Sequence, residues 1–130
     1  MTPTTAPTVL VVDDEAAIRQ IARRVLEDVG YQITEASNGL EGVEILAQGG
    51  PFDLLLADLD MPVLGGDEMV RRIRTTRPGL KVLYVTAHID SLMDTRPLRD
   101  GEAFLEKPFT GAGLREAVSL LLYGTLTKRN

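Results

Sequence analysis

The 130-residue sequence contains no cysteine, no tryptophan and a single histidine. The absence of cysteine excludes disulfide bonds and thiolate metal sites, and it suits a reducing cytoplasm, which is the location we expect. No apolar run approaches the roughly 18 residues of a membrane-spanning helix, and no N-terminal stretch has the charged-then-apolar pattern of a signal peptide. We therefore expect no association with a membrane.

The balance of charges argues against nucleic acid as a partner. Fourteen lysine and arginine residues are outnumbered by nineteen aspartate and glutamate residues, which gives a net charge of −5. A domain of this sign does not bind a phosphate backbone through its overall charge. We interpret the one basic run, Arg71, Arg72, Arg74 and Arg77, as a solvated helix face.

Five short segments are predicted as strands, most of them nearly continuous apolar runs of the kind found in buried parallel sheets. They are Thr8–Val12, Gln32–Ala36, Phe52–Ala57, Lys81–Thr86 and Ala103–Lys107.

Four helices are predicted from apolar residues at helical spacing. Their apolar positions are, in order, Ile18, Ile21, Ala22, Val25, Leu26 and Val29; Leu40, Val43 and Leu46; Met69, Val70 and Ile73; and Leu114, Val118, Leu121 and Leu122. We expect the second helix over Gly39–Ala47, the third to run to Pro78-Gly79, and the last to begin near Gly113.

Strands that alternate with helices imply βαβ units with right-handed crossovers and a parallel sheet. Five such units in 130 residues predict an α/β fold, a three-layer α/β/α sandwich with a five-stranded parallel sheet. Such sheets bind ligands at the carboxyl ends of their strands. The residues that end the strands are therefore the candidates for a functional site.

Polar residues end four of the predicted strands. Asp13 and Asp14 follow the first, Asp58 follows the third, Thr86 closes the fourth and Lys107 closes the fifth. Carboxylates crowded at neighbouring strand ends repel one another, by about 4 kcal/mol for a pair roughly 4 Å apart at a dielectric near 20. One lysine offsets only part of this charge, so the pattern predicts a hard cation such as Mg²⁺. A carboxylate beside Mg²⁺ and a lysine is also suited to accept a phosphoryl group.

Taken singly, these residues have simpler interpretations. An Asp-Asp pair after a strand often caps the following helix, and a lone threonine or lysine at a strand end is unremarkable. Their occurrence together at four strand ends favours a site.

Four segments resemble the signature motifs of response-regulator receiver domains, the phosphorylatable modules of bacterial two-component systems. They are VLVVDDE (Val9–Glu15), LLLADLDMP (Leu54–Pro62), VLYVTA (Val82–Ala87) and FLEKPF (Phe104–Phe109). The resemblance implies a flavodoxin-like strand order of 2-1-3-4-5. It also implies a receiver domain over residues 8–123, between a disordered tail of residues 1–7 and a C-terminal tail of residues 124–130.

The resemblance assigns a phosphoacceptor and a metal site. Asp58 is expected to carry the phosphoryl group as an aspartyl phosphate. Mg²⁺ is expected to bind Asp14 directly, Asp13 mainly through water, and Asp58. The backbone carbonyl of Asp60, not its side chain, is expected to be a further ligand.

The resemblance also assigns the residues around the phosphoryl group. Thr86, the backbone N–H of Ala87 and Lys107 are expected to contact it, and Phe104 is the switch aromatic that turns inward when Thr86 moves. Lys107–Pro108 matches a peptide bond that is cis in this family.

Four other residues lie near the predicted site. Ile18 and Phe109 are candidates for contact with a kinase, with core packing as the alternative for each. His88 and Asp60 are candidates for influencing hydrolysis of the acyl phosphate, with a solvated loop position as the alternative.

Two features depart from the family pattern. Gly65-Gly66 replaces the more usual acid-glycine pair, which removes a likely cap of the third helix. Pro97 interrupts the segment between Thr86 and Ala103, so we expect a fourth helix that is short, displaced or poorly ordered and that stops or kinks near Thr95.

We therefore expect a signalling switch that catalyses only its own phosphorylation and dephosphorylation. Its phosphodonor partner would be a sensor histidine kinase or a histidine phosphotransfer protein, and its output would be a change of conformation read by another protein. The alternative is a haloacid dehalogenase-like phosphohydrolase using Asp58 and Asp60, although that motif usually ends the first strand and has threonine where Pro62 stands. A degenerate receiver that only binds a partner is the third possibility, against which the complete set of strand-end residues argues.

Overall fold

A five-stranded parallel sheet forms the middle layer of the protein, which we describe from a computed structural model over residues 6–88 and 99–124. The strands β1 (Thr8–Val12), β2 (Gln32–Ala36), β3 (Leu54–Asp58), β4 (Lys81–Thr86) and β5 (Glu102–Glu106) lie in the order β2-β1-β3-β4-β5. The predicted α/β class and strand order are confirmed.

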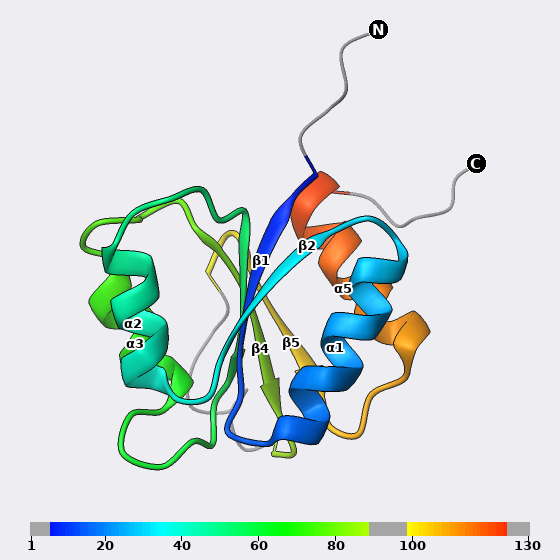
Figure 1. Ribbon diagram of the computed structural model, residues 1–130, viewed down its shortest axis with the longest axis horizontal. Coiled ribbons are helices and arrows are strands. Elements are labelled where there is room, and N and C mark those ends of the chain that lie inside the picture. The colour runs from blue at the N-terminus through cyan, green and yellow to red at the C-terminus, as the bar shows by residue number, and fades with distance from the viewer. Residues whose placement is uncertain (1–5, 89–98, 125–130) are drawn as a thin grey trace, which may run out of the picture.

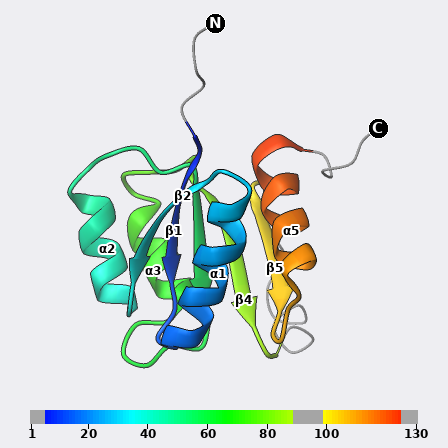
Figure 2. The same ribbon diagram turned by 45° about the vertical axis from the view of Figure 1, so that its right-hand side comes forward.

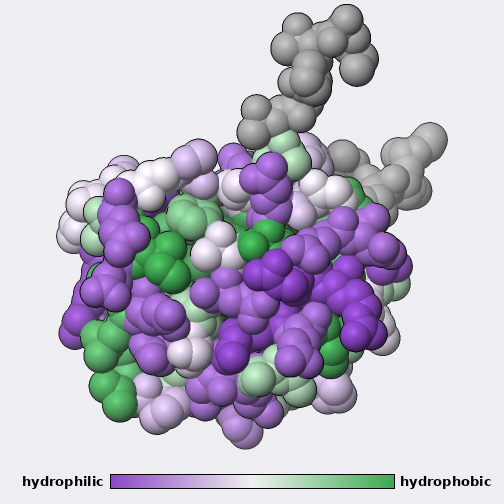
Figure 3. Space-filling model, in the orientation of Figure 1, coloured by the Kyte–Doolittle hydropathy of each residue, from purple (hydrophilic) through white to green (hydrophobic). Residues whose placement is uncertain are grey.

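Helices cover both faces of this sheet (Figures 1 and 2). On one face lie α1 (Ala16–Asp28) and α5 (Gly111–Tyr123), and on the other lie α2 (Gly39–Ala47) and α3 (Gly66–Ile73). Among the described residues, no helix has both the length and the apolar character needed to cross a membrane. The surface that carries α1 and β2 is mostly hydrophilic (Figure 3).

The core alternates between the two faces because successive strand residues point to opposite sides of a sheet. In β3, Leu54 and Leu56 belong to the apolar cluster under α1 and α5, whereas Leu55 and Ala57 belong to the cluster under α2 and α3. All four side chains are fully buried. This double burial explains why the strand is apolar throughout until it ends at Asp58.

The register of the strands places their polar ends at one edge of the sheet. Val12 pairs with Ala57, Asp58 pairs with Val85, and Thr86 pairs with Glu106. The residues that follow or close these strands are therefore neighbours in space, although they are far apart in the sequence.

Some helix positions and bounds differ from the prediction. Ile21, Val29 and Leu40 are each about half exposed, at 46%, 50% and 51%. The inner side of α2 is lined partly by glycine, and a Cβ at Gly42 would lie 2.8 Å from Sδ of Met69 on α3. This close approach of the two helices leaves Leu40 on the outside.

Two helix bounds were also misplaced. The third helix ends at Ile73, before the predicted stop at Pro78-Gly79. The last helix begins at Gly111 because the side chain of Thr110 accepts a hydrogen bond from the N–H of Gly113 and caps it.

Two arginines of the basic run are structural. Arg74 Nη2 lies 3.1 Å from Oε2 of the buried Glu102, and Arg77 Nη2 donates to the carbonyl oxygen of Gly50 at 2.8 Å. Interpreting the run as a solvated helix face is therefore wrong for Arg74 and Arg77. The predicted interruption at Pro97 falls in residues 89–98, outside the described part of the chain.

Candidate functional site

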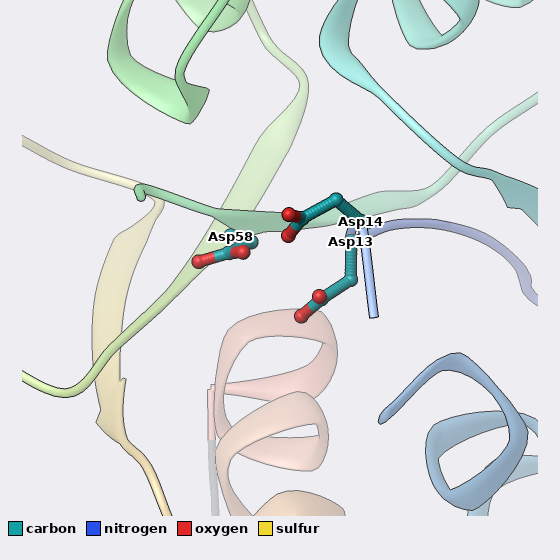
Figure 4. A group of neighbouring side chains, drawn as sticks. All are labelled: Asp13, Asp14 and Asp58. Carbon is teal, nitrogen blue, oxygen red and sulfur yellow. The ribbon is translucent and has the colours of Figure 1, made fainter. Parts of the chain in front are cut away.

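Three aspartates converge at the carboxyl edge of the sheet (Figure 4). Asp13 and Asp14 directly follow β1, and Asp58 is the last residue of β3. One carboxylate oxygen from each lies within 4.8 Å of the other two. Asp13 and Asp58 are buried, at 0% and 2% exposure, whereas Asp14 is exposed to solvent. The structure thus brings together the acidic residues that the sequence analysis selected.

Lys107 is the one cation of the described residues that forms ion pairs with Asp13 and Asp58. Its Nζ atom lies 3.1 Å from Oδ2 of Asp13, 3.6 Å from Oδ2 of Asp58 and 3.1 Å from Oε1 of Glu15. Three carboxylates therefore share a single ammonium group, and the local charge stays negative.

Burial and mutual repulsion change the protonation of this cluster. Burial raises the pKa of Asp58 to about 6, and the charge of Asp13 acts in the same direction. The hydrogen bond from the Asp60 N–H and the charge of Lys107 oppose this rise. Burial also raises the pKa of Asp13. In both cases burial outweighs the opposing effect of Lys107, so the ionised forms of the two carboxyls are disfavoured.

The two oxygens of Asp13 have different surroundings. Oδ1 accepts a hydrogen bond from the N–H of Glu15 at 2.9 Å. Oδ2 is buried and accepts no hydrogen bond from the described residues, although Lys107 Nζ is near it. The residue that caps α1 is Glu15, and it makes no side-chain capping bond. The arrangement therefore fits an oxygen-binding cation better than a helix cap.

The loop after β3 orients the Asp58 side chain, and the start of α3 lies close to the Asp58 backbone. Asp58 Oδ1 accepts a hydrogen bond from the N–H of Asp60 at 3.1 Å. A Cβ at Gly66 would lie 2.7 Å from the carbonyl oxygen of Asp58, and one at Gly65 would lie 2.8 Å from that of Leu59. Gly65 caps α3 without a side-chain bond, as expected. The glycine pair thus gives α3 no side-chain cap, but it allows the helix to begin directly against the end of β3.

Thr86 closes β4 beside this loop. Its side chain is buried, and Oγ1 donates to Oδ2 of Asp60 at 2.9 Å while it accepts from the N–H of His88 at 3.0 Å. Ala87, Asp60 and His88 are exposed at the rim. No sequence pattern indicates this hydrogen bond between the side chains of Thr86 and Asp60.

Comparison with known proteins agrees with this arrangement. The family model described as "Response regulator receiver domain" matches residues 9–119. The chain is 35% identical to the Sensor kinase CckA of Brucella abortus over 88% of its length, which is 12% of that kinase. It is 32% identical to Sporulation initiation phosphotransferase F of Bacillus subtilis, covering 88% of this chain and 92% of that protein.

A solved structure is similar over nearly all of the chain. The chemotaxis response regulator CheY4 of Vibrio cholerae aligns with a TM-score of 0.81 at 30% identity, covering 91% of this chain and 100% of that one. The chain belongs to the response regulator receiver domain family. It spans only about half the length of response regulators that it matches, and less of the sensor kinase.

The other residues that the sequence singled out lie on or after β5 and on α1. Phe104 on β5 is half-buried, and its ring centroid lies 5.5 Å from that of Tyr84 on β4. The Lys107–Pro108 peptide bond is cis. Phe109 is half-buried and packs against the core under α1 and α5, and Ile18 is also half-buried. For Phe109, core packing accounts for at least part of its position.

Proposed function

We propose that this receiver domain accepts a phosphoryl group on Asp58 in a Mg²⁺-dependent reaction. The observation that carries the proposal is the position of Asp58, which is buried beside two further aspartates and lies 3.6 Å from the ammonium group of Lys107. The phosphodonor would be a sensor histidine kinase or a histidine phosphotransfer protein, since one of the relatives is a sensor kinase and another a phosphotransferase.

Mg²⁺ would be held by the carboxylates of Asp13, Asp14 and Asp58 and by the backbone carbonyl of Asp60. This donor set consists only of oxygens, which is what Mg²⁺ prefers. The bound ion would neutralise negative charge on the transferring phosphoryl oxygens. The convergence of three carboxylates, with only the Lys107 ammonium group paired to Asp13 and Asp58 among the described residues, supports this assignment.

Each residue of the site would have its own role in phosphoryl transfer. A carboxylate oxygen of Asp58 forms the new bond to phosphorus while the bond to the donor nitrogen of phosphohistidine breaks. The hydrogen bond from the N–H of Asp60 fixes the orientation of the Asp58 carboxylate before the reaction. Lys107 stabilises the charge on the phosphoryl oxygens, and the Thr86 hydroxyl and the Ala87 N–H complete the contacts.

Signalling follows from the movement of Thr86 toward the phosphoryl group. Phe104 would then turn inward, and a partner protein would recognise the altered surface. We propose that the receiver domain extends over residues 8–123 and that it works in the cytoplasm, with Ile18 and Phe109 near the contact with the kinase.

Intact-mass measurement after incubation with acetyl phosphate and Mg²⁺ tests the proposal. The wild-type protein should gain one phosphoryl group, and Asp58→Asn should gain none. Replacing Mg²⁺ with EDTA should abolish the gain. Labelling of Asp58→Asn at the wild-type rate would refute the assignment, and repeated turnover of a phosphomonoester would favour the dehalogenase-like hydrolase instead.

A further inference from the structure

The hydroxyl proton of Thr86 is already engaged in this structure. Its single proton goes to Oδ2 of Asp60 at 2.9 Å, and its oxygen accepts from the N–H of His88 at 3.0 Å. A hydroxyl carries only one hydrogen to donate. The Thr86 hydroxyl therefore cannot donate to a phosphoryl group on Asp58 until it leaves Asp60.

Asp60 contacts both Asp58 and Thr86. Its backbone N–H donates to Oδ1 of Asp58 at 3.1 Å, and its side chain accepts from Thr86. The two contacts come from different atoms of Asp60. A substitution of its side chain therefore removes the contact with Thr86 and leaves the backbone contact with Asp58. It also leaves the backbone carbonyl that is expected to bind Mg²⁺.

We propose that the Asp60 carboxylate is a latch that holds Thr86 in its resting position and weakens the response to phosphorylation. The proposal rests on the proposed function and deepens it, since it names a residue that sets the balance between the resting and activated states. Asp60 is here a positioning residue that acts through Thr86.

The size of the effect follows from the kind of bond. A hydrogen bond to a charged carboxylate is stronger than one between neutral groups, and its loss corresponds to a factor of about ten in an equilibrium constant. Without the latch, Thr86 would be available to the phosphoryl group at once. The activated arrangement would then form about tenfold more readily.

A thermodynamic cycle with beryllium fluoride, a mimic of the phosphoryl group, tests this inference. Four proteins are compared at saturating Mg²⁺: wild type, Asp60→Ala, Thr86→Ala and the double variant. Binding is followed by fluorine NMR because the chain contains no tryptophan for fluorescence. Asp60→Ala should bind the mimic about tenfold more tightly than wild type.

The cycle separates two effects of the Asp60 carboxylate on binding of the mimic, its hydrogen bond to Thr86 and its negative charge. Removing that charge also favours an anion directly, but this contribution persists when Thr86 is replaced. The gain from Asp60→Ala should therefore be several-fold smaller in the Thr86→Ala background. Asp60→Asn is the matched control, because it removes the charge while its amide oxygen still accepts a weaker hydrogen bond from Thr86, so its gain in mimic binding should be smaller than that of Asp60→Ala.

A second measurement needs neither metal nor mimic. In EDTA, the cost of Asp60→Ala in urea unfolding should be smaller in the Thr86→Ala background than in the wild-type background, because the two side chains share one hydrogen bond. Equal gains in mimic binding in both backgrounds, together with additive stabilities, would overturn the latch. If the wild-type protein neither binds the mimic nor is phosphorylated, the proposed function is wrong. The regulatory role of Asp60 then fails with it, whatever the result of urea unfolding in EDTA.

Discussion

Lys107 and Asp13 form an ion pair of 3.1 Å across the carboxyl edge of the sheet, although their strands, β5 and β1, are separated by two others. The same ammonium group lies 3.6 Å from Asp58, at the end of the strand next to β1. Lys107 therefore links residues from widely separated parts of the chain, and it offsets part of the repulsion between two buried carboxylates.

Replacing Lys107 with methionine should destabilise the metal-free protein at pH 7 by about 3 kcal/mol, because it leaves buried charges without their partner. The loss should shrink on acidification, which protonates the carboxylates, and on addition of Mg²⁺. Urea unfolding in EDTA and in Mg²⁺ measures both effects.

Lys81→Met is the matched control for this substitution. The Nζ atom of Lys81 contacts the carbonyl oxygen of Leu122 at 3.4 Å, at the opposite end of the strands. We expect a change below about 1 kcal/mol that does not depend on Mg²⁺. A Lys107→Met defect that is the same at every pH and in Mg²⁺ would contradict this account.

Asp58→Asn should stabilise the metal-free protein at neutral pH. The pKa of Asp58 is raised to about 6 in the folded state, above the value of about 3.9 for an unfolded aspartate. The folded state therefore binds the proton more tightly, so the contribution of Asp58 to stability is fully present below about pH 4 and is lost as the pH rises through 6. The neutral asparagine avoids this loss.

The gain from Asp58→Asn should be about 3 kcal/mol at pH 7 and should vanish below about pH 4. Urea unfolding in EDTA between these values gives the profile. Asp28→Asn removes the same charge from an exposed position on α1 and controls for net charge. An Asp58→Asn gain of equal size at pH 4 and pH 7 would show that protonation is not its cause.

The parts of the fold that follow from local periodicity were predictable from the sequence. Apolar runs indicated the five strands, and the parallel sheet that they imply placed the polar strand ends at one edge. Asp13, Asp58 and Lys107 could therefore be grouped before any coordinates were known, because the register of the strands brings their ends together.

The contacts that could not be predicted from the sequence depend on where side chains of different elements point in the folded protein. The bond from Thr86 to Asp60 joins the end of β4 to the loop after β3, and that from Arg74 to Glu102 joins the C-cap of α3 to β5. Neither has a fixed spacing in the sequence. The exposed position of Leu40 likewise follows from the close packing of α2 on α3 at Gly42, a property of the helix pair that hydrophobicity alone does not reveal.

Gly66→Ala should destabilise the protein and disturb the site. The added Cβ would lie 2.7 Å from the carbonyl oxygen of Asp58, which is backbone and cannot rotate away. Shifting α3 or the end of β3 should cost about 1–3 kcal/mol and slow phosphorylation by acetyl phosphate. Chemical unfolding and intact mass measure the two effects.

Gly79→Ala provides the comparison for Gly66→Ala. A Cβ at Gly79 would meet no atom within 4 Å, and its backbone is not in the left-handed region. This variant should be unchanged or more stable by about 0.4–1 kcal/mol, with wild-type phosphorylation. If both glycine variants behaved alike, the contact at Asp58 would not matter.

Mg²⁺ should stabilise the folded protein, and substitutions at the two adjacent aspartates should separate metal binding from folding. At 100 times its Kd, a ligand that binds only the native state adds about 2.7 kcal/mol to the free energy of unfolding. Asp14→Ala and Asp13→Ala should each lose this response. Melting temperatures with Mg²⁺ and with EDTA provide the measurement.

The two variants should differ when the metal is absent. Asp14 is exposed, and its removal relieves repulsion, so Asp14→Ala in EDTA should be as stable as wild type or more stable. Asp13 is fully buried, its Oδ1 accepts the N–H of Glu15, and its Oδ2 pairs with Lys107. Asp13→Ala should therefore melt below wild type in EDTA, since it removes the hydrogen bond of the Glu15 N–H and the ion pair with Lys107. A metal-free Asp14→Ala protein that melts well below wild type would show that Asp14 supports the fold itself, and the crowding of carboxylates would then not be the reason that Mg²⁺ stabilises it.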